Sequence, residues 1–178
     1  MPRYVAFLRA INVGGHTVAM STLRDLFAQM GLRNAETFIA SGNVVFESGQ
    51  AAAALEKRIE KRLESALGYS VATFVRTDEQ VRAISLYRPF SDAAMKTAQA
   101  LNIGFLRGPL APGGLEALRR FRTEIDDFRA HGSEIYWLCR KKQSESTFNN
   151  RVFERAADVR ATFRGASTIV RLAGKLAA

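Results

Sequence analysis

VAFLRA at residues 5–10 and IGFLRG at residues 103–108 share an apolar run that ends in an arginine. Each run is long enough for a short buried strand, and the arginine lies where that strand ends. Two further pairs of matching segments follow in the same order: FIASGNVVF at 38–46 with FRAHGSEIY at 128–136, and ATF at 72–74 with ATF at 161–163. Three matches in one order predict that a single unit occurs twice, by duplication.

Hydrophobic periodicity around these segments predicts the same succession of elements in both halves. In the first half we expect strands at 4–8, 36–40, 44–48 and 71–75, and helices at 22–30 (with Ser21 as N-cap), 50–67 and 78–86. In the second half we expect strands at 102–108, 126–130, 134–139 and 160–164, and helices at 114–121, 146–157 and 167–177. Strand, helix, strand, strand, helix, strand is the order of the ferredoxin-like fold. The sequence therefore predicts an α+β protein of two tandem ferredoxin-like (βαββαβ) plaits related by duplication, plus a C-terminal helix.

RPFSDAAMK at 88–96 lies between the two copies, and its Pro89 and Ser91 suit a linker. We therefore expect a first ferredoxin-like subdomain at 1–90 and a second at 91–178. The first strand is apolar on both faces, which is typical of a strand that is covered on both sides. We expect the two halves to pack on each other, so that the crevice between them forms the natural ligand pocket.

The charge balance is that of a basic protein. The 178 residues include 26 Lys and Arg against 17 Asp and Glu, a net charge of +9. Such an excess favours anionic partners, namely nucleic acid or phosphorylated ligands. The alternative is that these basic side chains are simply solvated, because no block of five like charges occurs.

Cysteine, histidine and apolar content limit the location and the chemistry. The single cysteine, Cys139, cannot form an intrachain disulfide, which fits a reducing compartment. With only two histidines beside it, a zinc site of the usual kind is not expected. No apolar stretch approaches membrane-spanning length. We expect a cytoplasmic protein, a monomer or a weak dimer, with no membrane contact, no metal and no cofactor.

FLRAINVGG at 7–15 and SGNVVFES at 41–48 resemble the two signatures of the bacterial domain-of-unknown-function-1697 family, the first of which usually reads FLRGINVGG. ATFRGASTIVRL at 161–172 is similar to the family's C-terminal Thr-x-Arg-Asn-x-x-Thr-Val block. The resemblance covers the whole length of the chain. It implies a duplicated α+β plait, and it implies no particular activity.

The sequence departs from the family's pattern at three places. Ala10 stands where the family usually has Gly, and Gly165 stands where it usually has Asn. CRKKQSES at 139–146 replaces the usual Gly-x-Gly-x-Ser-Lys stretch. A ligand that contacts these positions in the family would be bound differently here.

A glycine pair follows the first strand. The backbone N–H groups of Gly14 and Gly15 can form an anion nest, with Arg9 at its rim and Asn12 in the same loop. The alternative is a tight strand-to-helix turn, because neither a P-loop Lys-Ser/Thr nor a Gly-x-Gly-x-x-Gly fingerprint accompanies the pair.

The other candidate residues lie at strand ends. Arg9 and Arg107 occupy the same place in the two copies and can clamp a carboxylate or phosphate, unless they form surface ion pairs. Asn43 lies in a hairpin turn that either sets its amide at the sheet end or uses it for turn chemistry. Arg164 ends the last strand and Thr168 opens the final helix, which suits an anion or a plain N-cap. The predicted ligand-binding residues are Arg9, Asn12, Gly14, Gly15, Asn43, Arg107, Arg164 and Thr168.

No catalytic residues are predicted. The chain has no Gly-x-Ser-x-Gly elbow. Adjacent carboxylates such as Asp126 and Asp127 would point apart on a strand. The leading hypothesis is therefore non-catalytic binding of a small anionic or phosphorylated ligand in the crevice between the two subdomains.

The alternative is RNA binding through the basic surface. An RNA-recognition motif has the same element order and stacks bases on aromatic residues of its central strands. SGNVVFES lacks the Lys/Arg-Gly-aromatic-Gly-Phe core of that signature. If the sheet face is covered, the aromatic residues on the equivalent strands belong to the core instead: Phe7, Phe46, Phe105 and Tyr136.

Overall fold

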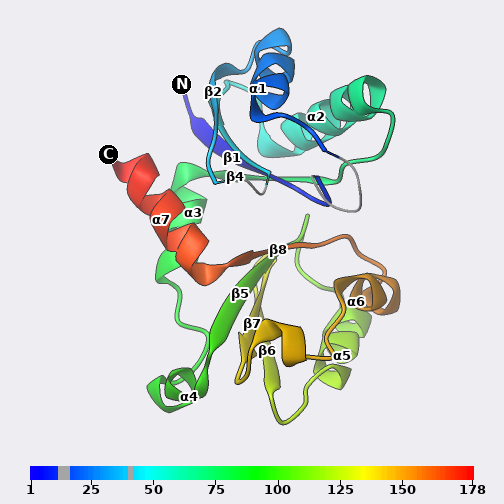
Figure 1. Cartoon of the computed structure of the whole chain (residues 1–178), viewed down its shortest axis with the longest axis vertical. Helices are drawn as coiled ribbons and strands as arrows, with labels where there is room; N and C mark the ends of the chain where they lie inside the picture. The colour runs from blue at the N-terminus through cyan, green and yellow to red at the C-terminus, as the bar shows by residue number, and fades with distance from the viewer. Residues whose placement is uncertain (12–16, 40–41) are drawn as a thin grey trace. The chain divides into compact units, whose positions relative to one another are not determined.

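The computed structural model describes residues 1–11, 17–39 and 42–178, which form two compact units. The first unit is Met1–Ile84 together with Leu172–Ala178, and the second unit is Ser85–Arg171. Figure 1 labels most of the elements of both units. No helix within the described ranges is long and apolar enough to cross a membrane.

The first unit is a four-stranded antiparallel sheet with helices after its first and third strands. Its strands are β1 (Arg3–Leu8), β2 (Arg33–Thr37), β3 (Asn43–Glu47) and β4 (Thr73–Thr77), in the spatial order β2-β3-β1-β4. Its helices are α1 (Met20–Gln29), α2 (Ala52–Leu67) and α3 (Asp78–Leu86), which begins directly after β4.

The second unit has the same plan. Its strands are β5 (Ala100–Phe105), β6 (Asp126–His131), β7 (Glu134–Cys139) and β8 (Thr162–Gly165), in the order β6-β7-β5-β8. Its helical elements are α4 (Asp92–Thr97), α5 (Pro112–Arg120), the 3-10 turn η1 (Gln143–Glu145), α6 (Asn150–Ala157) and the start of α7 (Ala166–Ala177). Both sheets have the strand order of a ferredoxin-like plait, so the expected α+β class, with two such plaits and a C-terminal helix, is confirmed.

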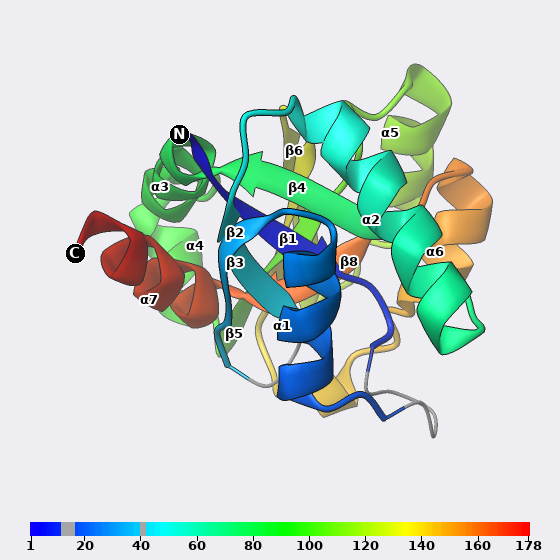
Figure 2. The same cartoon turned by 90° about the horizontal axis from the view of Figure 1, so that it is seen from above.

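Residue spacing explains how the helices of the first unit pack on its sheet. In α2, Leu55, Ile59 and Leu63 are buried and recur at every fourth position, which places them on one stripe of the helix. That stripe belongs to the same buried cluster as alternate residues of β1. Figure 2 shows α1 and α2 next to each other over this sheet.

Helix ends follow local backbone rules in both units. α2 ends at Gly68, whose φ of 83° is the left-handed conformation that glycine adopts without steric cost. α6 ends at Asp158, which adopts the same region with φ 54°. The N-cap expected at Ser21 is wrong, because α1 begins at Met20 and Ser21 lies inside its first turn. The actual N-cap, Ala19, has no side chain that could cap the helix.

The last residues of α7 complete the first unit. Arg3 donates a hydrogen bond to the carbonyl of Leu176. Lys175 Nζ lies 3.0 Å from a carboxylate oxygen of Glu36 and 5.7 Å from the ring centre of Phe38. These contacts hold the end of α7 against β1 and β2.

Strand registers define which positions of the two units correspond. Val5 of β1 pairs with Arg76, and Ile103 of β5 pairs with Arg164. If Val5 corresponds to Ile103, as VAFLRA and IGFLRG indicate, then Arg76 corresponds to Arg164. The ATF match would instead equate Val75 with Arg164. A shift of one residue exchanges the two faces of a strand, so the ATF match is not a structural equivalence.

The hairpin match fails for the same reason. It equates Phe46 with Tyr136. The side chain of Phe46 lies on the sheet face that the helices cover, whereas Tyr136, which pairs with Ile103, lies on the other face of its own sheet. The registers of the two units instead relate Val45 to Tyr136. The duplication therefore stays a prediction, which the shared element order and strand order support.

Candidate functional site

The strand-end residues predicted in the first unit take part in its backbone structure. Asn43 begins β3, is fully buried, and donates from Nδ2 to the carbonyl of Phe38 at 3.1 Å. The backbone N–H of Phe38 donates in return to the carbonyl of Asn43 at 2.9 Å, so Asn43 closes the hairpin. Arg9 directly follows β1, and its backbone N–H donates to the carbonyl of Ala72 at 2.9 Å. Three predicted residues lie outside the described residues: Asn12, Gly14 and Gly15.

Within the second unit, the predicted site residues do not converge. Arg107 is exposed just after the C-terminal end of β5. Arg164 of β8 pairs with Ile103, which lies four residues, or about 13 Å, before Arg107 along the strand. β5 and β8 are antiparallel, so their C-terminal ends lie at opposite ends of the sheet. Thr168 lies partly buried in the first turn of α7, on the side of Arg164 rather than Arg107.

Arg164 is buried and held by its own strand. Its Nη1 donates to Thr162 Oγ1 at 2.7 Å and to the carbonyl of Phe163 at 2.9 Å. Burial lowers the pKa of the Arg164 guanidinium to about 10, because a charged group loses its hydration there. The side chain therefore keeps its charge at neutral pH. Arg76, at the corresponding position of the first unit, is also buried.

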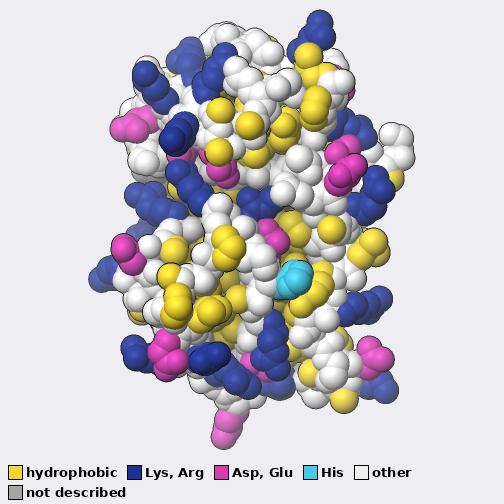
Figure 3. All heavy atoms as spheres, turned by 180° about the vertical axis from the view of Figure 1, so that it is seen from behind, with side chains coloured by type: hydrophobic (Ala, Val, Ile, Leu, Met, Phe, Trp, Pro, Cys, Tyr) yellow, Lys and Arg dark blue, Asp and Glu magenta, His cyan; other side chains and the backbone are white. Residues whose placement is uncertain are grey.

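The aromatic residues that an RNA-recognition motif would use are not available for stacking. Phe7, Phe46 and Phe105 are 0% exposed and Tyr136 is 1% exposed, so their interpretation as core residues is confirmed. The face drawn in Figure 3 shows Lys and Arg side chains scattered among Asp and Glu side chains rather than gathered in one block.

A cavity of about 220 Å³ lies between α5 and β6, within the second unit. Apolar side chains form part of its lining, and three arginines form another part. Its lining residues are Leu115, Leu118, Arg119, Arg122, Phe128, Arg129 and Ala130. This cavity brings guanidinium groups and an apolar surface together within one unit.

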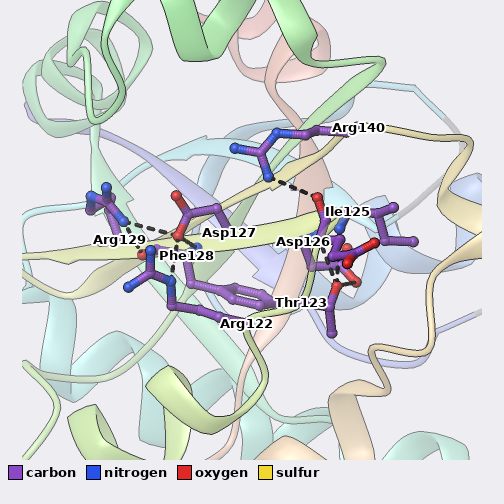
Figure 4. A network of polar contacts seen from close by, with 9 residues as sticks. Arg122, Thr123, Ile125, Asp126, Asp127, Phe128, Arg129 and Arg140 are labelled. Atoms are coloured by element: carbon purple, nitrogen blue, oxygen red, sulfur yellow. Dashed lines mark hydrogen bonds and ion pairs between the residues drawn. The ribbon is translucent and has the colours of Figure 1, made fainter.

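Asp127 holds two of these arginines in place (Figure 4). Its Oδ1 accepts from Arg122 Nε at 2.9 Å, from Arg129 Nη1 at 3.0 Å and from the backbone N–H of Phe128 at 2.8 Å. The Asp127 side chain is 11% exposed, whereas Arg122 and Arg129 are 53% and 46% exposed. A guanidinium has five N–H donors, so both arginines keep donors for a ligand while their positions are fixed.

Asp126, the neighbouring carboxylate, points the other way and fixes the loop that carries Arg122. Its Oδ1 accepts from Trp137 Nε1 at 2.8 Å. Its Oδ2 accepts from Ser146 Oγ at 2.8 Å and from Thr123 Oγ1 at 3.2 Å. The expectation that the two carboxylates point apart is confirmed, and Asp126 anchors the residue next to Arg122.

Sequence reasoning missed this cavity. Its signal was present as LRRFR at 118–122, which has three arginines in four positions after the helix core. Arg129 lies on the following strand, and only the return of β6 past the end of α5 places it beside Arg122. Arg122 lies outside the repeated segments and Arg129 matches Ile39 within one, so neither arginine recurs in the first half.

The fold and the cavity define a class: paired ferredoxin-like plaits, of which the second carries an arginine-lined cavity. The chain belongs to the family described as "Protein of unknown function (DUF1697)", whose model matches residues 1–136. The family resemblance noted in the sequence is thereby confirmed.

Among solved structures, the chain is similar to one described as "The structure of conserved bacterial protein SP0830 from Streptococcus pneumoniae". The two share 19% sequence identity over 100% of this chain and 99% of that one, with a TM-score of 0.74. At this identity the similarity supports the fold alone. No curated protein matches the chain.

Proposed function

We propose that this protein binds a small anionic or phosphorylated ligand without transforming it. The observation that carries the proposal is the cavity between α5 and β6, where Arg119, Arg122 and Arg129 meet an apolar surface. Guanidinium groups bind phosphate and carboxylate oxygens through paired N–H donors. A volume of about 220 Å³ suits a ligand smaller than an ordinary drug molecule.

The local charge also favours an anion. Glu116 pairs with Arg119 at 3.5 Å, and Asp127 pairs with both other arginines. Two carboxylates thus face three guanidinium groups, which leaves an excess of positive charge at the cavity. The guanidinium groups of Arg122 and Arg129 are 53% and 46% exposed, so their remaining donors are accessible to a ligand oxygen.

The side chains at the cavity support the proposal of binding without catalysis. None of the lining side chains described there is a Ser, Thr, Cys, His, Lys, Asp or Glu, the residues that supply nucleophiles and general bases. Asp127, just beside the cavity, already accepts three hydrogen bonds. Within the described part of the chain, no group of three or more His, Cys, Asp or Glu residues could hold a metal ion.

The proposal moves the site from the predicted crevice to a cavity inside the second unit, because Arg164 pairs with Ile103, about 13 Å before Arg107 along β5. It keeps the predicted ligand class. It also keeps a cytoplasmic location and an origin by duplication, which the identical strand orders support.

Thermal unfolding in the presence of inorganic phosphate, pyrophosphate and sugar phosphates tests the proposal. We expect at least one phosphorylated compound to raise the Tm of the wild-type chain, because a ligand that binds only the folded state stabilises it. The double variant Arg119→Ala/Arg122→Ala should lose that shift. Arg155→Ala removes an exposed arginine from α6 and should keep it. A shift that persists in the double variant, or no shift with any anion, would sink the proposal.

RNA binding through the basic surface remains the second candidate, favoured by the net charge of +9. Fluorescence anisotropy with a short RNA at several salt concentrations separates it from the first. Tight binding with a steep decrease as salt rises would indicate many phosphate contacts. Binding that Arg119→Ala/Arg122→Ala leaves unchanged would place the RNA elsewhere on the surface.

A further inference from the structure

Three aromatic rings are packed at the exposed end of β6. The rings of Tyr87 and His131 are stacked, with centroids 3.9 Å apart and planes 9° from parallel. Tyr136 supports Tyr87 from another side, at 5.2 Å and 47°. Tyr136 is 1% exposed and Tyr87 is 39% exposed, while His131 is exposed on the last residue of the strand. His131 is exposed as a residue, so part of its ring is accessible to solvent beside the Tyr87 stack.

These rings lie beside the arginines of the cavity. His131 and Arg129 are two residues apart on β6, so their side chains leave the same face of the strand about 7 Å apart. The segment that precedes α4 runs along that face, because Tyr87 stacks on His131 and the Phe90 ring lies 5.1 Å from Arg129 Cζ. The guanidinium groups of Arg122 and Arg129 and the exposed ring of His131 are therefore neighbours.

We infer that the phosphorylated ligand is a nucleotide, whose phosphate contacts Arg122 and Arg129 and whose base stacks on His131. The inference rests on the proposed function, since it names the ligand class for the same arginines. Arginine pairs bind phosphate oxygens, and aromatic rings stack on any nucleobase because every base has a π-face. In a nucleotide, the ribose connects the phosphate at the arginines to the base at His131. A simple sugar phosphate has no base and can make only the contact with the arginines.

The stack itself is the reason to prefer a nucleotide over a smaller anion. An exposed histidine on an exposed strand end contributes little to the core, yet here it is held parallel to a tyrosine that a third ring supports. A bare phosphate would use only the arginines and leave this surface without a role. Stacking without hydrogen bonds to the base edge predicts weak discrimination between purines and pyrimidines, with purines favoured by their larger ring area.

Isothermal titration of the full chain with inorganic phosphate, ribose 5-phosphate, AMP and UMP tests the inference. We expect AMP and UMP to bind about fivefold or more tightly than ribose 5-phosphate, which is the contribution of one stacked base. His131→Ala should remove that difference and leave the affinity for ribose 5-phosphate unchanged, and His131→Phe should preserve it. Leu86→Ala, which truncates an exposed neighbour of Tyr87, is the matched control and should change neither affinity.

The outcomes separate this inference from the proposed function. If ribose 5-phosphate binds as tightly as AMP, the nucleotide inference is overturned and anion binding stands. If no phosphorylated compound binds, both fail. If His131→Ala does not fold, the wild-type imidazole Cε1–H signal provides a second test by NMR. A stacked base shifts that signal upfield when AMP is added, and a resonance that does not move overturns the inference.

Discussion

Ala6 faces Val75 in the first unit, and Gly104 faces Phe163 at the corresponding place in the second. A Cβ built on Gly104 would lie 2.6 Å from Cε1 of Phe163, so the phenyl ring occupies the space of the missing methyl group. The two units therefore fill the same layer of the core differently. The first unit pairs Ala6 with Val75, and the second pairs a glycine with the large Phe163 ring. The comparison teaches that a shared strand order constrains the sum of side-chain volumes more than the residue at each position.

Phe46 and Trp137 form a second corresponding pair, since each lies opposite the matching residue of the central strand. Phe46 stacks on Tyr4 with ring centroids 5.7 Å apart and has no polar group to satisfy. Trp137 brings an indole N–H into the core and requires the carboxylate of Asp126. That carboxylate also anchors Thr123, next to Arg122. The polar ring of Trp137 thus helps to organise the loop that carries Arg122.

The outer edges of β4 and β8 show what the units have in common. Glu60 accepts the backbone N–H of Thr73 at 3.0 Å, and Glu154 accepts the backbone N–H of Ala161 at 2.9 Å. In each unit a helix carboxylate thereby satisfies one backbone N–H at the start of an edge strand.

The largest effect is expected at Asp126. Asp126→Ala leaves the buried indole N–H of Trp137 without its acceptor and releases the partly exposed hydroxyls of Thr123 and Ser146, and should reduce the free energy of unfolding by about 3 kcal/mol. In a Trp137→Phe background, which restores the ring type of the first unit, the same substitution should cost less. Urea unfolding of the four combinations measures the difference. Equal costs in the two backgrounds would contradict the coupling between indole and carboxylate.

Gly104→Ala should follow, with a loss of about 2 kcal/mol, because the new methyl group overlaps the Phe163 ring. Combining it with Phe163→Val recreates the Ala–Val pair of the first unit. The double variant should therefore be more stable than the sum of the two single losses predicts, as measured in a double-mutant cycle. Ala6→Gly is the control in the first unit, where nothing overlaps and no such coupling is expected.

Ala10→Gly should stabilise the protein by about 1 kcal/mol. Ala10 has φ 59°, a left-handed conformation that is costly for a residue with a Cβ. Its counterpart Gly108 does not adopt that region, so Gly108→Ala should bring no comparable change. Thermal unfolding of both variants decides the matter, and a lower Tm for Ala10→Gly would show that the methyl group makes compensating contacts.

A smaller gain is expected at the end of α6. Asp158 occupies the left-handed position that glycine occupies after α2, so Asp158→Gly should stabilise by about 0.5 kcal/mol. The reverse exchange, Gly68→Asp, should destabilise by a similar amount. Chemical denaturation should show that the two variants change the free energy of unfolding in opposite directions. Two changes of the same sign would contradict the prediction.

The smallest effect concerns reactivity rather than stability. Burial raises the pKa of the Cys139 thiol, so at pH 8 less of it is thiolate than in a free cysteine. Labelling with a thiol reagent should be slow and should accelerate as pH rises toward that pKa. In the first unit the corresponding residue is Ser48, so every label should map to the second unit. Rapid labelling at pH 7 would contradict the buried position.

Periodicity sufficed to predict the order of elements, because each buried stripe in α2 or apolar run such as VAFLRA is a local property. The equivalence of the units could not be taken from letters, because their hairpins differ in length. Residues 39–42 separate Phe38 from Asn43, whereas only 132–133 separate the ends of β6 and β7. An alignment that matches Gly42 with Gly132 therefore places the strands after the two turns one residue out of register.

Site prediction was limited by the same locality. The sequence predicted that the strand-end arginines lie together, but Arg164 pairs with Ile103 within β5, four residues before Arg107, and this pairing is a tertiary property. The arginines of the cavity come from a loop and from a neighbouring strand, and their approach depends on how Asp126 and Asp127 hold that loop. Neither carboxylate differs in sequence from an ordinary surface residue.

The contacts of Lys175 and Leu176 with β1 and β2 bear on how this protein is made in the cell. A ribosome delivers the first unit's sheet long before residues 172–178, while the second unit is complete in sequence once Arg171 has emerged. The first unit can therefore complete its contacts with α7 only after residues 172–178 have emerged, when every residue of the second unit is already available. Chaperones that bind nascent chains should accordingly associate longest with the N-terminal segment.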